Sequence, residues 1–277
     1  MKLTSQIQRR FILWDKKAAL TKRQQFVLGT AVLVFGLMLT EVVSTDLRYP
    51  MTMALSLVAY AAAALVLREN LRGIKWLTLL LLPTLFTLSI SLFYFLLPTR
   101  WLTRIPFLVL YAVGMYALML TENIYHVASE RTIALLRAAH SVGYLITLTT
   151  YFLLVQTVLA FRFPAIVNTL LIGVISFFLV FQSLWSVVLE DNVSKRVWAV
   201  TIAISLVLTE LAWLFSYLPT QSTLIVLFIM TSFYGMVGMA QQYLVEKLYK
   251  KTVVEFFSLT SIVFIITMIA THWRGSF

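Results

Sequence analysis

The sequence predicts an all-α integral membrane protein, and its composition, its apolar runs and the placement of its basic residues support this. Of the 277 residues, 61% are hydrophobic and 12% are charged, whereas a soluble domain is about 25% charged. The mean hydropathy is +0.91. The apolar runs are continuous at helical length, unlike the alternating segments of about ten residues in an outer-membrane β-barrel. The sequence therefore indicates a bundle of helices in lipid.

Nine apolar runs are long enough for helices that cross a bilayer, which need roughly 20 apolar residues each. We expect transmembrane helices at 24–44, 50–67, 74–97, 101–121, 138–161, 164–188, 197–217, 221–241 and 254–271. The segments between them are too short to fold as independent domains. The sequence thus predicts a basic cytoplasmic segment at 1–23 and a single transmembrane domain at 24–277.

Turn residues and small residues support individual helices in chain order. Leu97-Pro98-Thr99 ends the third run and Leu218-Pro219-Thr220 ends the seventh, and both predict tight turns. Pro83 predicts a kink in the third helix. Gly235 and Gly238 in the eighth predict close approach of a neighbouring helix.

The N-terminal segment 1–23 is too charged for a signal peptide, so we expect the chain to keep it. Apolar residues recur there at helical spacing opposite a basic face, a pattern typical of a short helix at the headgroups of an anionic leaflet. The simpler alternative is a solvated topology signal. The apolar face comprises Ile7, Phe11, Trp14 and Ala18, and the basic face comprises Arg9, Arg10, Lys16 and Lys17.

The basic residues predict an orientation, because cytoplasmic loops carry an excess of Lys and Arg. With the N-terminus inside, 17 of the 22 Lys and Arg lie in cytoplasmic segments and 5 lie outside. Adding or removing one helix would mix the two sets, so the division favours nine helices, N-in and C-out. The outer residues are Arg48, Arg100, Arg104, Arg162 and Arg274.

Several functional classes lack support in the sequence. The net charge of +11 is explained by these loops and does not indicate nucleic-acid binding. The absence of Cys excludes disulfides and thiolate metal sites. The chain has no G-x-x-x-x-G-K-[ST], H-E-x-x-H or G-x-S-x-G motif, and no Lys lies mid-span to form a retinal Schiff base. We predict no cofactor.

The most polar segment near the predicted membrane surface joins the fourth and fifth runs. Glu122, His126 and Glu130 are spaced i, i+4 and i+8, so an uninterrupted helix would present them on one face. Carboxylate and imidazole ligands suit zinc, manganese or iron. The simpler interpretation is a solvated cytoplasmic hairpin whose charges pair locally, and a metal site is not a firm prediction.

Basic residues in the same segment suggest a different ligand. Arg131, Arg137 and His140 could clamp a phosphate or another anionic headgroup. We expect Arg137 and His140 to cluster with Glu122 or His126, because a turn between antiparallel helices brings their ends together. A haem is disfavoured, since neither His has a partner on another mid-span helix.

Part of this segment is similar in sequence to a known protein family. Glu122-Asn123-Ile124, Arg131-Thr132-Ile133 and Leu135 through His140 resemble about twenty residues in an uncharacterised family of small polytopic bacterial membrane proteins. The resemblance implies a bacterial cytoplasmic membrane as the location and implies no activity.

Polar residues inside the predicted spans form a second candidate site. Glu210 lies about two-thirds along the seventh run, and a carboxylate in a span costs at least about 2.5 kcal/mol unless it meets a partner, water or a proton. We therefore expect Glu210 to face protein, with Arg104 within reach. Glu41, Gln156 and Asn168 lie in the outer halves of their runs. The alternative for Glu210 is a structural hydrogen bond between helices.

Three functions remain open from the sequence. The first is transport or binding of a small or lipid-like molecule, and the second is a non-enzymatic scaffold or sensor that contacts anionic lipid or another membrane protein. The third, which we favour least, is a lipid-modifying enzyme that uses residues 122–140. A polar cavity at Glu210 would favour transport, a closed apolar bundle the scaffold, and a cytoplasmic cleft the enzyme.

Overall fold

The computed structural model describes residues 21–42, 47–67, 73–98, 100–128, 135–190 and 192–271. Within these ranges the chain forms nine α-helices and no strands. Most of the predicted N-terminal segment, residues 1–20, lies outside them. The helices are α2 (Lys22–Val42), α3 (Arg48–Leu67), α4 (Lys75–Tyr94), α5 (Trp101–Ala128), α6 (Leu136–Ala160), α7 (Ala165–Val188), α8 (Lys195–Phe215), α9 (Ser222–Leu244) and α10 (Lys250–Ile269).

Each described helix coincides with one predicted run and is long and apolar enough to cross a membrane, as expected for a multi-pass membrane protein. The main difference is the end of α5, which we predicted near residue 121 and which continues to Ala128. Polar side chains do not interrupt the hydrogen bonds of an α-helix, because these join backbone groups within it. The polar residues after Thr121 therefore extend α5 rather than forming a hairpin loop.

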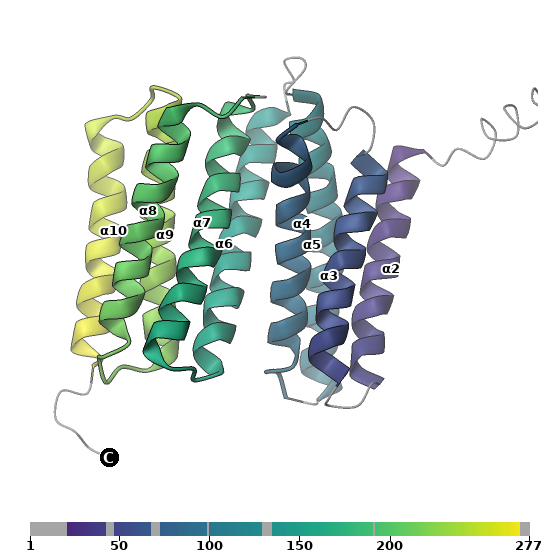
Figure 1. The fold of residues 1–277 in the computed structure, drawn as a ribbon, viewed down its shortest axis with the longest axis horizontal. Helices are drawn as coiled ribbons and strands as arrows, with labels where there is room; N and C mark the ends of the chain where they lie inside the picture. Colours follow the sequence, from purple (N-terminus) through teal and green to yellow (C-terminus); the bar gives the residue numbers. More distant parts are fainter. Residues whose placement is uncertain are drawn as a thin grey trace, which may run out of the picture.

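The helices run up and down, with successive helices antiparallel (Figure 1). α6 is central, because it packs against α4, α5, α7 and α9. α10 is peripheral and packs mainly against α9. Of the most apolar part of α6, 61% is buried, compared with 6% for α10. The α10 span is the more apolar of the two, so position in the bundle rather than apolar content explains this difference.

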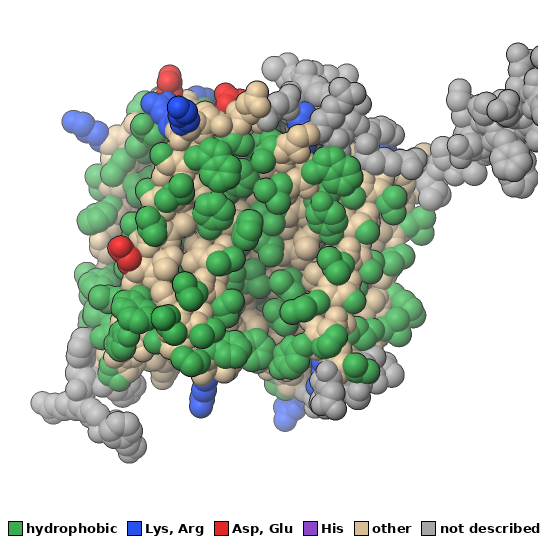
Figure 2. All heavy atoms as spheres, viewed as in Figure 1, with side chains coloured by type: hydrophobic (Ala, Val, Ile, Leu, Met, Phe, Trp, Pro, Cys, Tyr) green, Lys and Arg blue, Asp and Glu red, His purple; other side chains and the backbone are tan. Residues whose placement is uncertain are grey.

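On the face drawn in Figure 2, most charged side chains collect at the two ends of the bundle and apolar side chains cover most of the middle, where one acidic side chain is also visible. The basic end, at the top of Figure 1, is where α2, α4, α6, α8 and α10 begin. The opposite end has fewer described basic residues, namely Arg48, Arg100, Arg104 and Arg162. The described basic residues of the basic end are Lys22, Arg23, Lys75, Arg137, Lys195, Arg196, Lys247, Lys250 and Lys251.

Glycines allow α9 and α10 to approach closely, as predicted. A Cβ atom at Gly235 would lie 2.9 Å from Thr260 Oγ1, and one at Gly238 would lie 2.7 Å from the Phe256 ring. Both distances are below van der Waals contact. These positions require a residue without a side chain, and the Phe256 ring occupies the space above Gly238.

Candidate binding site

A groove with a volume of about 630 Å³ lies at the basic end between α6 and α9, and we call it the basic groove. Two of its lining residues are basic, Arg137 on α6 and Lys247 after α9, and none of the described lining residues is acidic. Other polar groups come from His140, Ser141, Gln241 and Gln242, and the apolar part from Leu136, Tyr144, Val187, Tyr234, Gly238, Val245 and Phe256. The groove therefore combines positive charge with aromatic and aliphatic surface.

Aromatic side chains form the wall of the basic groove that lies deeper along the helices. The Tyr144 hydroxyl donates a hydrogen bond to the Tyr234 carbonyl oxygen at 2.7 Å, and the two rings stack with centroids 5.9 Å apart. The Tyr234 ring meets the Phe256 ring edge to face at 5.1 Å. Because these contacts join α6, α9 and α10, the aromatic wall is held by three helices.

Polar side chains of the groove also bind to α7. Gln241 Nε2 donates to both the carbonyl oxygen and the hydroxyl of Ser183, at 3.1 Å and 2.9 Å. His140 Nε2 lies 2.9 Å from the Ser186 carbonyl oxygen. The Ser183 and Ser186 carbonyls face these partners in the last two turns of α7. The groove lining is thus tied to the interior of the bundle.

Behind the groove lies a buried polar cluster that comprises Glu122 and Tyr125 of α5 and Gln182 of α7. Glu122 is 0% exposed and Gln182 is 1% exposed. Gln182 Nε2 donates to Glu122 Oε1 at 3.4 Å, a long hydrogen bond. Gln182 is followed in the chain by Ser183, which bonds to Gln241, so the cluster and the groove meet at neighbouring positions of α7.

Tyr125 joins this cluster to α6. Its hydroxyl donates to the Ala139 carbonyl oxygen at 3.0 Å, and its ring lies 5.5 Å from that of His140. Gly143 makes room for the hydroxyl, because a Cβ atom there would collide with it. Tyr125 therefore separates the carboxyl group of Glu122 from the groove-lining His140 by one side chain.

The prediction of a solvated hairpin is wrong for Glu122 and His126, which are both buried on α5. The extension of α5 to Ala128 places them against α6 and α7. Of the expected grouping, Arg137 and His140 lie together in the lining of the groove, but His140 packs beside Tyr125, which separates it from Glu122. Glu130 and Arg131 lie outside the described residues.

Within the described ranges, no group of three His, Asp or Glu side chains has the arrangement of a metal site. The metal and haem alternatives therefore gain no support from Glu122, His126 and His140. The basic groove combines charge with apolar surface and is therefore a candidate binding site.

The prediction that Glu210 faces protein is wrong. Its side chain is exposed on α8, and the structure shows no hydrogen bond or ion pair between it and a described residue. Its neighbour Thr209 faces α7 instead, where it closely approaches Gly173. A rotation of about 100° per residue separates their directions. Glu210 therefore does not line a cavity between α8 and its neighbours.

Arg104 does not reach Glu210, contrary to expectation. Its guanidinium group lies 5.3 Å from the centroid of the Tyr94 ring of α4, whereas α8 packs against α7 and α9. Asn168 is buried and donates to the Phe163 carbonyl oxygen at 2.9 Å, so it supports the start of α7. Gln156 is half-buried on α6. Glu41 lies in the last turn of α2, and its side chain is outside the described part.

Sequence reasoning missed the polar residues Gln182, Ser183 and Gln241, which lie where the groove meets the cluster, and Lys247, which lines the groove. Both glutamines were available as signals, because each lies within a predicted apolar run where an amide needs a hydrogen-bond partner. Glu210 drew attention instead because it is charged. Lys247 gave no signal of its own among the basic loop residues.

Comparison with known proteins identifies the family. Residues 30–270 match the family model described as "Protein of unknown function (DUF5656)". No curated protein and no solved structure matches the chain. The resemblance to an uncharacterised family is confirmed, without a test of bacterial origin. Since the match spans most of its length, the chain belongs to the DUF5656 family, for which no activity is known.

Proposed function

We propose that this protein binds an anionic amphiphile, such as a membrane lipid, in the basic groove. Arg137 and Lys247 supply positive charge at the mouth of the groove, and none of its described lining residues is acidic. Tyr144, Tyr234 and Phe256 supply apolar surface deeper along the helices. An anionic headgroup and an apolar chain would complement these two parts. The proposal rests on one observation, namely that charged and aromatic surfaces occupy separate parts of the same groove.

The proposal includes a location and an orientation. The protein would lie in a bacterial cytoplasmic membrane with its N-terminus inside and its C-terminus outside. The uneven distribution of Lys and Arg between the two ends of the bundle supports this orientation. The groove would then open at the cytoplasmic headgroups, where anionic lipids attract basic residues.

The size of the groove is compatible with this ligand class. Binding sites for small molecules typically have volumes of about 300–1,000 Å³, and the groove measures about 630 Å³. This volume would accommodate a headgroup and part of an acyl chain, with the rest of the chain in the bilayer. The groove is therefore suited to holding a lipid at the edge of the bundle.

Native mass spectrometry of the protein released from bilayers of mixed phosphatidylglycerol and phosphatidylcholine tests the proposal. We expect Arg137→Gln combined with Lys247→Gln to reduce retained phosphatidylglycerol at least about tenfold, because loss of two charge-assisted contacts costs about 1.5 kcal/mol or more. The control, Lys195→Gln with Lys250→Gln, removes the same charge at the same end outside the groove. Equal losses in both variants would contradict a groove site and indicate general surface attraction.

The same groove bears on the other functions considered from the sequence. Glu122 and His126 lie behind its wall rather than in it, which weakens the case for a lipid-modifying enzyme that uses them. A scaffold or sensor role would be consistent with stable lipid retention without movement across the membrane. Lipid flux in reconstituted vesicles separates a transporter from a scaffold.

A further inference from the structure

Glu122 presents an electrostatic problem that the groove does not solve. Its side chain is 0% exposed, and its Oε2 atom accepts no hydrogen bond from a described residue. No described Lys or Arg forms an ion pair with it. An isolated carboxylate in an apolar interior is strongly unfavourable, so it needs a neutralising cation or a proton.

Gln182 supplies the second half of a site. It is 1% exposed, and its Oε1 atom also has no hydrogen-bond partner. Rotation of the amide by half a turn exchanges its oxygen and nitrogen with little change of shape. The amide oxygen would then take the nitrogen position, 3.4 Å from Glu122 Oε1.

Two kinds of cation would satisfy this pair of oxygen atoms. Two ligands at right angles around an ion with metal–oxygen distances of about 2.4 Å are about 3.4 Å apart. A proton on Glu122 would instead let the carboxyl group donate a hydrogen bond to the Gln182 oxygen. In both cases the Gln182 oxygen gains a partner and the charge of Glu122 is neutralised.

We propose that Glu122 and Gln182 form a binding site for a neutralising monovalent cation, either a proton or a sodium-sized metal ion. The site lies directly behind the basic groove. It is distinct from the groove because its oxygen atoms come from α5 and α7, whereas the groove charges come from α6 and the segment after α9.

A polar connection joins the site to the groove. Gln182 is adjacent to Ser183, which accepts two hydrogen bonds from the groove-lining Gln241. A ligand that takes up the Gln241 amide would release Ser183 and change the position of Gln182. Cation binding is therefore coupled to occupancy of the groove, and this coupling alone rests on the proposed function.

Other titratable groups lie on the helices that pack around α5, and any effect of pH must be separated from them. α7 presents only neutral amide and hydroxyl groups to Glu122. No described group in this set forms an ion pair with Glu122. The set comprises Arg104, Tyr111, Tyr116, Tyr125 and His126 on α5, Arg137, His140, Tyr144 and Tyr151 on α6, Lys75 and Tyr94 on α4, Arg48, Tyr49 and Tyr60 on α3, and Lys22 and Arg23 on α2.

Thermal unfolding of the full chain in phosphatidylcholine nanodiscs tests the site, with pH varied from 5 to 9 in either sodium chloride or choline chloride. We expect the wild-type midpoint to rise by about 3 °C or more with sodium or with acid, because a ligand that binds only the folded state stabilises it. Glu122→Gln should abolish this response, since the amide is neutral. Glu210→Gln makes the same change on the exposed face and should retain the full response.

The two cations give different patterns. A sodium response that Gln182→Leu abolishes identifies a metal ion, whereas an acid response without a sodium response identifies a proton. His126→Gln and His140→Gln should both keep the response. The proposal is overturned if the wild type responds to neither cation, or if Glu122→Gln responds like the wild type.

A direct measurement covers the case in which Glu122→Gln does not fold. In that case we would measure the binding of radioactive sodium and the uptake of protons by the wild type and by Gln182→Leu. The loss of the amide oxygen should reduce the affinity for sodium at least tenfold or alter the uptake of protons. Equal sodium binding and equal proton uptake in both would overturn the site.

The coupling has its own readout. Binding of a soluble short-chain phosphatidylglycerol should change with sodium or pH in the wild type and not in Glu122→Gln. If this lipid does not bind at all, the proposed function fails while the cation site stands on the unfolding data. If it binds without any dependence on the cation, the coupling is wrong.

Discussion

Glu122 and Glu210 are both carboxylates within long apolar helices, yet they occupy opposite environments. Glu122 is completely buried between α5 and α7, where Gln182 contacts it. Glu210 is exposed on the outer face of α8. The two residues lie at similar depths, because Glu210 is five residues from the end of α8 at Phe215 and Glu122 is six residues from the end of α5 at Ala128. Whether a polar residue in a span contacts protein therefore depends on the helix face it occupies rather than on its depth along the helix.

The spacing of buried residues explains the difference. On α5 the buried positions Tyr111, Met115 and Leu118 continue at steps of four and three to Glu122 and Tyr125, which is one helical face. On α8 the corresponding face comprises Thr201, Ile204, Ser205, Leu208, Ala212 and Phe215. Residue 210 lies two positions from Leu208 and from Ala212, and therefore on the opposite side of the helix.

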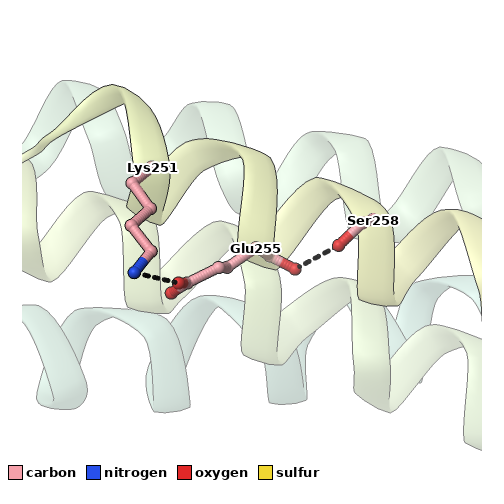
Figure 3. Close-up of polar contacts among 3 residues, drawn as sticks. All are labelled: Lys251, Glu255 and Ser258. Carbon is pink, nitrogen blue, oxygen red and sulfur yellow. Dashed lines mark hydrogen bonds and ion pairs between the residues drawn. The ribbon is translucent and has the colours of Figure 1, made fainter.

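A third carboxylate, Glu255, shows how an exposed acid can be accommodated. It lies in the second turn of α10, where Lys251 Nζ is 3.9 Å from its Oε1 atom and Ser258 donates to its backbone carbonyl (Figure 3). The side chains of Lys251 and Glu255 are 89% and 65% exposed. Unlike Glu210, Glu255 lies near the basic end and has a partner one turn away.

The largest expected difference is between Leu substitutions at the two glutamates. Glu122→Leu should lower the free energy of unfolding by about 1–3 kcal/mol, because it leaves the buried Gln182 amide without its partner. Glu210→Leu should change it by less than about 0.5 kcal/mol, since the side chain makes no contact that folding forms. Reversible unfolding in detergent micelles measures both. A larger loss for Glu210→Leu would show that its face is covered by another protein.

Two tyrosine hydroxyls allow a second comparison of a buried polar group with an exposed one. Tyr125→Phe should destabilise the protein by about 1 kcal/mol, because the buried Ala139 carbonyl loses the hydrogen bond from the hydroxyl. Tyr217→Phe, at an exposed position two residues after the end of α8, serves as the matched control and should be close to neutral. The same unfolding assay applies. Equal effects at the two positions would argue against the packing of Tyr125 on α6.

Glycine substitutions test the inner face of α8. At Gly173 a Cβ atom would lie 2.6 Å from Thr209 Oγ1, whereas at Gly29 it would meet nothing within 4 Å. Gly29→Ala should stabilise α2 by up to about 1 kcal/mol through helix propensity. Gly173→Ala should not increase the free energy of unfolding in this way, because Thr209 would have to move away from the added methyl group. Equal stabilisation of both variants, measured by unfolding, would place Thr209 away from α7.

The exposed ion pair should have the smallest effect. A double-mutant cycle of Lys251→Gln and Glu255→Gln should give a coupling free energy below about 0.5 kcal/mol, because both side chains are hydrated or mobile in the unfolded and folded states. Unfolding midpoints at low and high salt provide the measurement. A coupling that exceeds the cost of Glu122→Leu would reverse the order expected from burial.

The class of fold and the number and positions of the described helices were all predictable from the amino-acid sequence alone. This was possible because each span needs about 20 apolar residues, a requirement that acts locally along the chain. All nine described helices coincide with predicted runs. Arg137 and His140 were also identified in advance as residues of a possible anionic site, and both line the basic groove.

Which face of each helix is buried depends on how the helices pack against one another, and this packing is known only from the three-dimensional structure. In a span that is apolar on all sides, the hydrophobic pattern does not distinguish the protein-facing side from the lipid-facing side. The contacts of Glu122 with Gln182 and of Gln241 with Ser183 join residues 60 and 58 positions apart. Such pairs depend on how whole helices pack, which is why Glu210 was wrongly expected to face protein and the buried network behind the groove was missed.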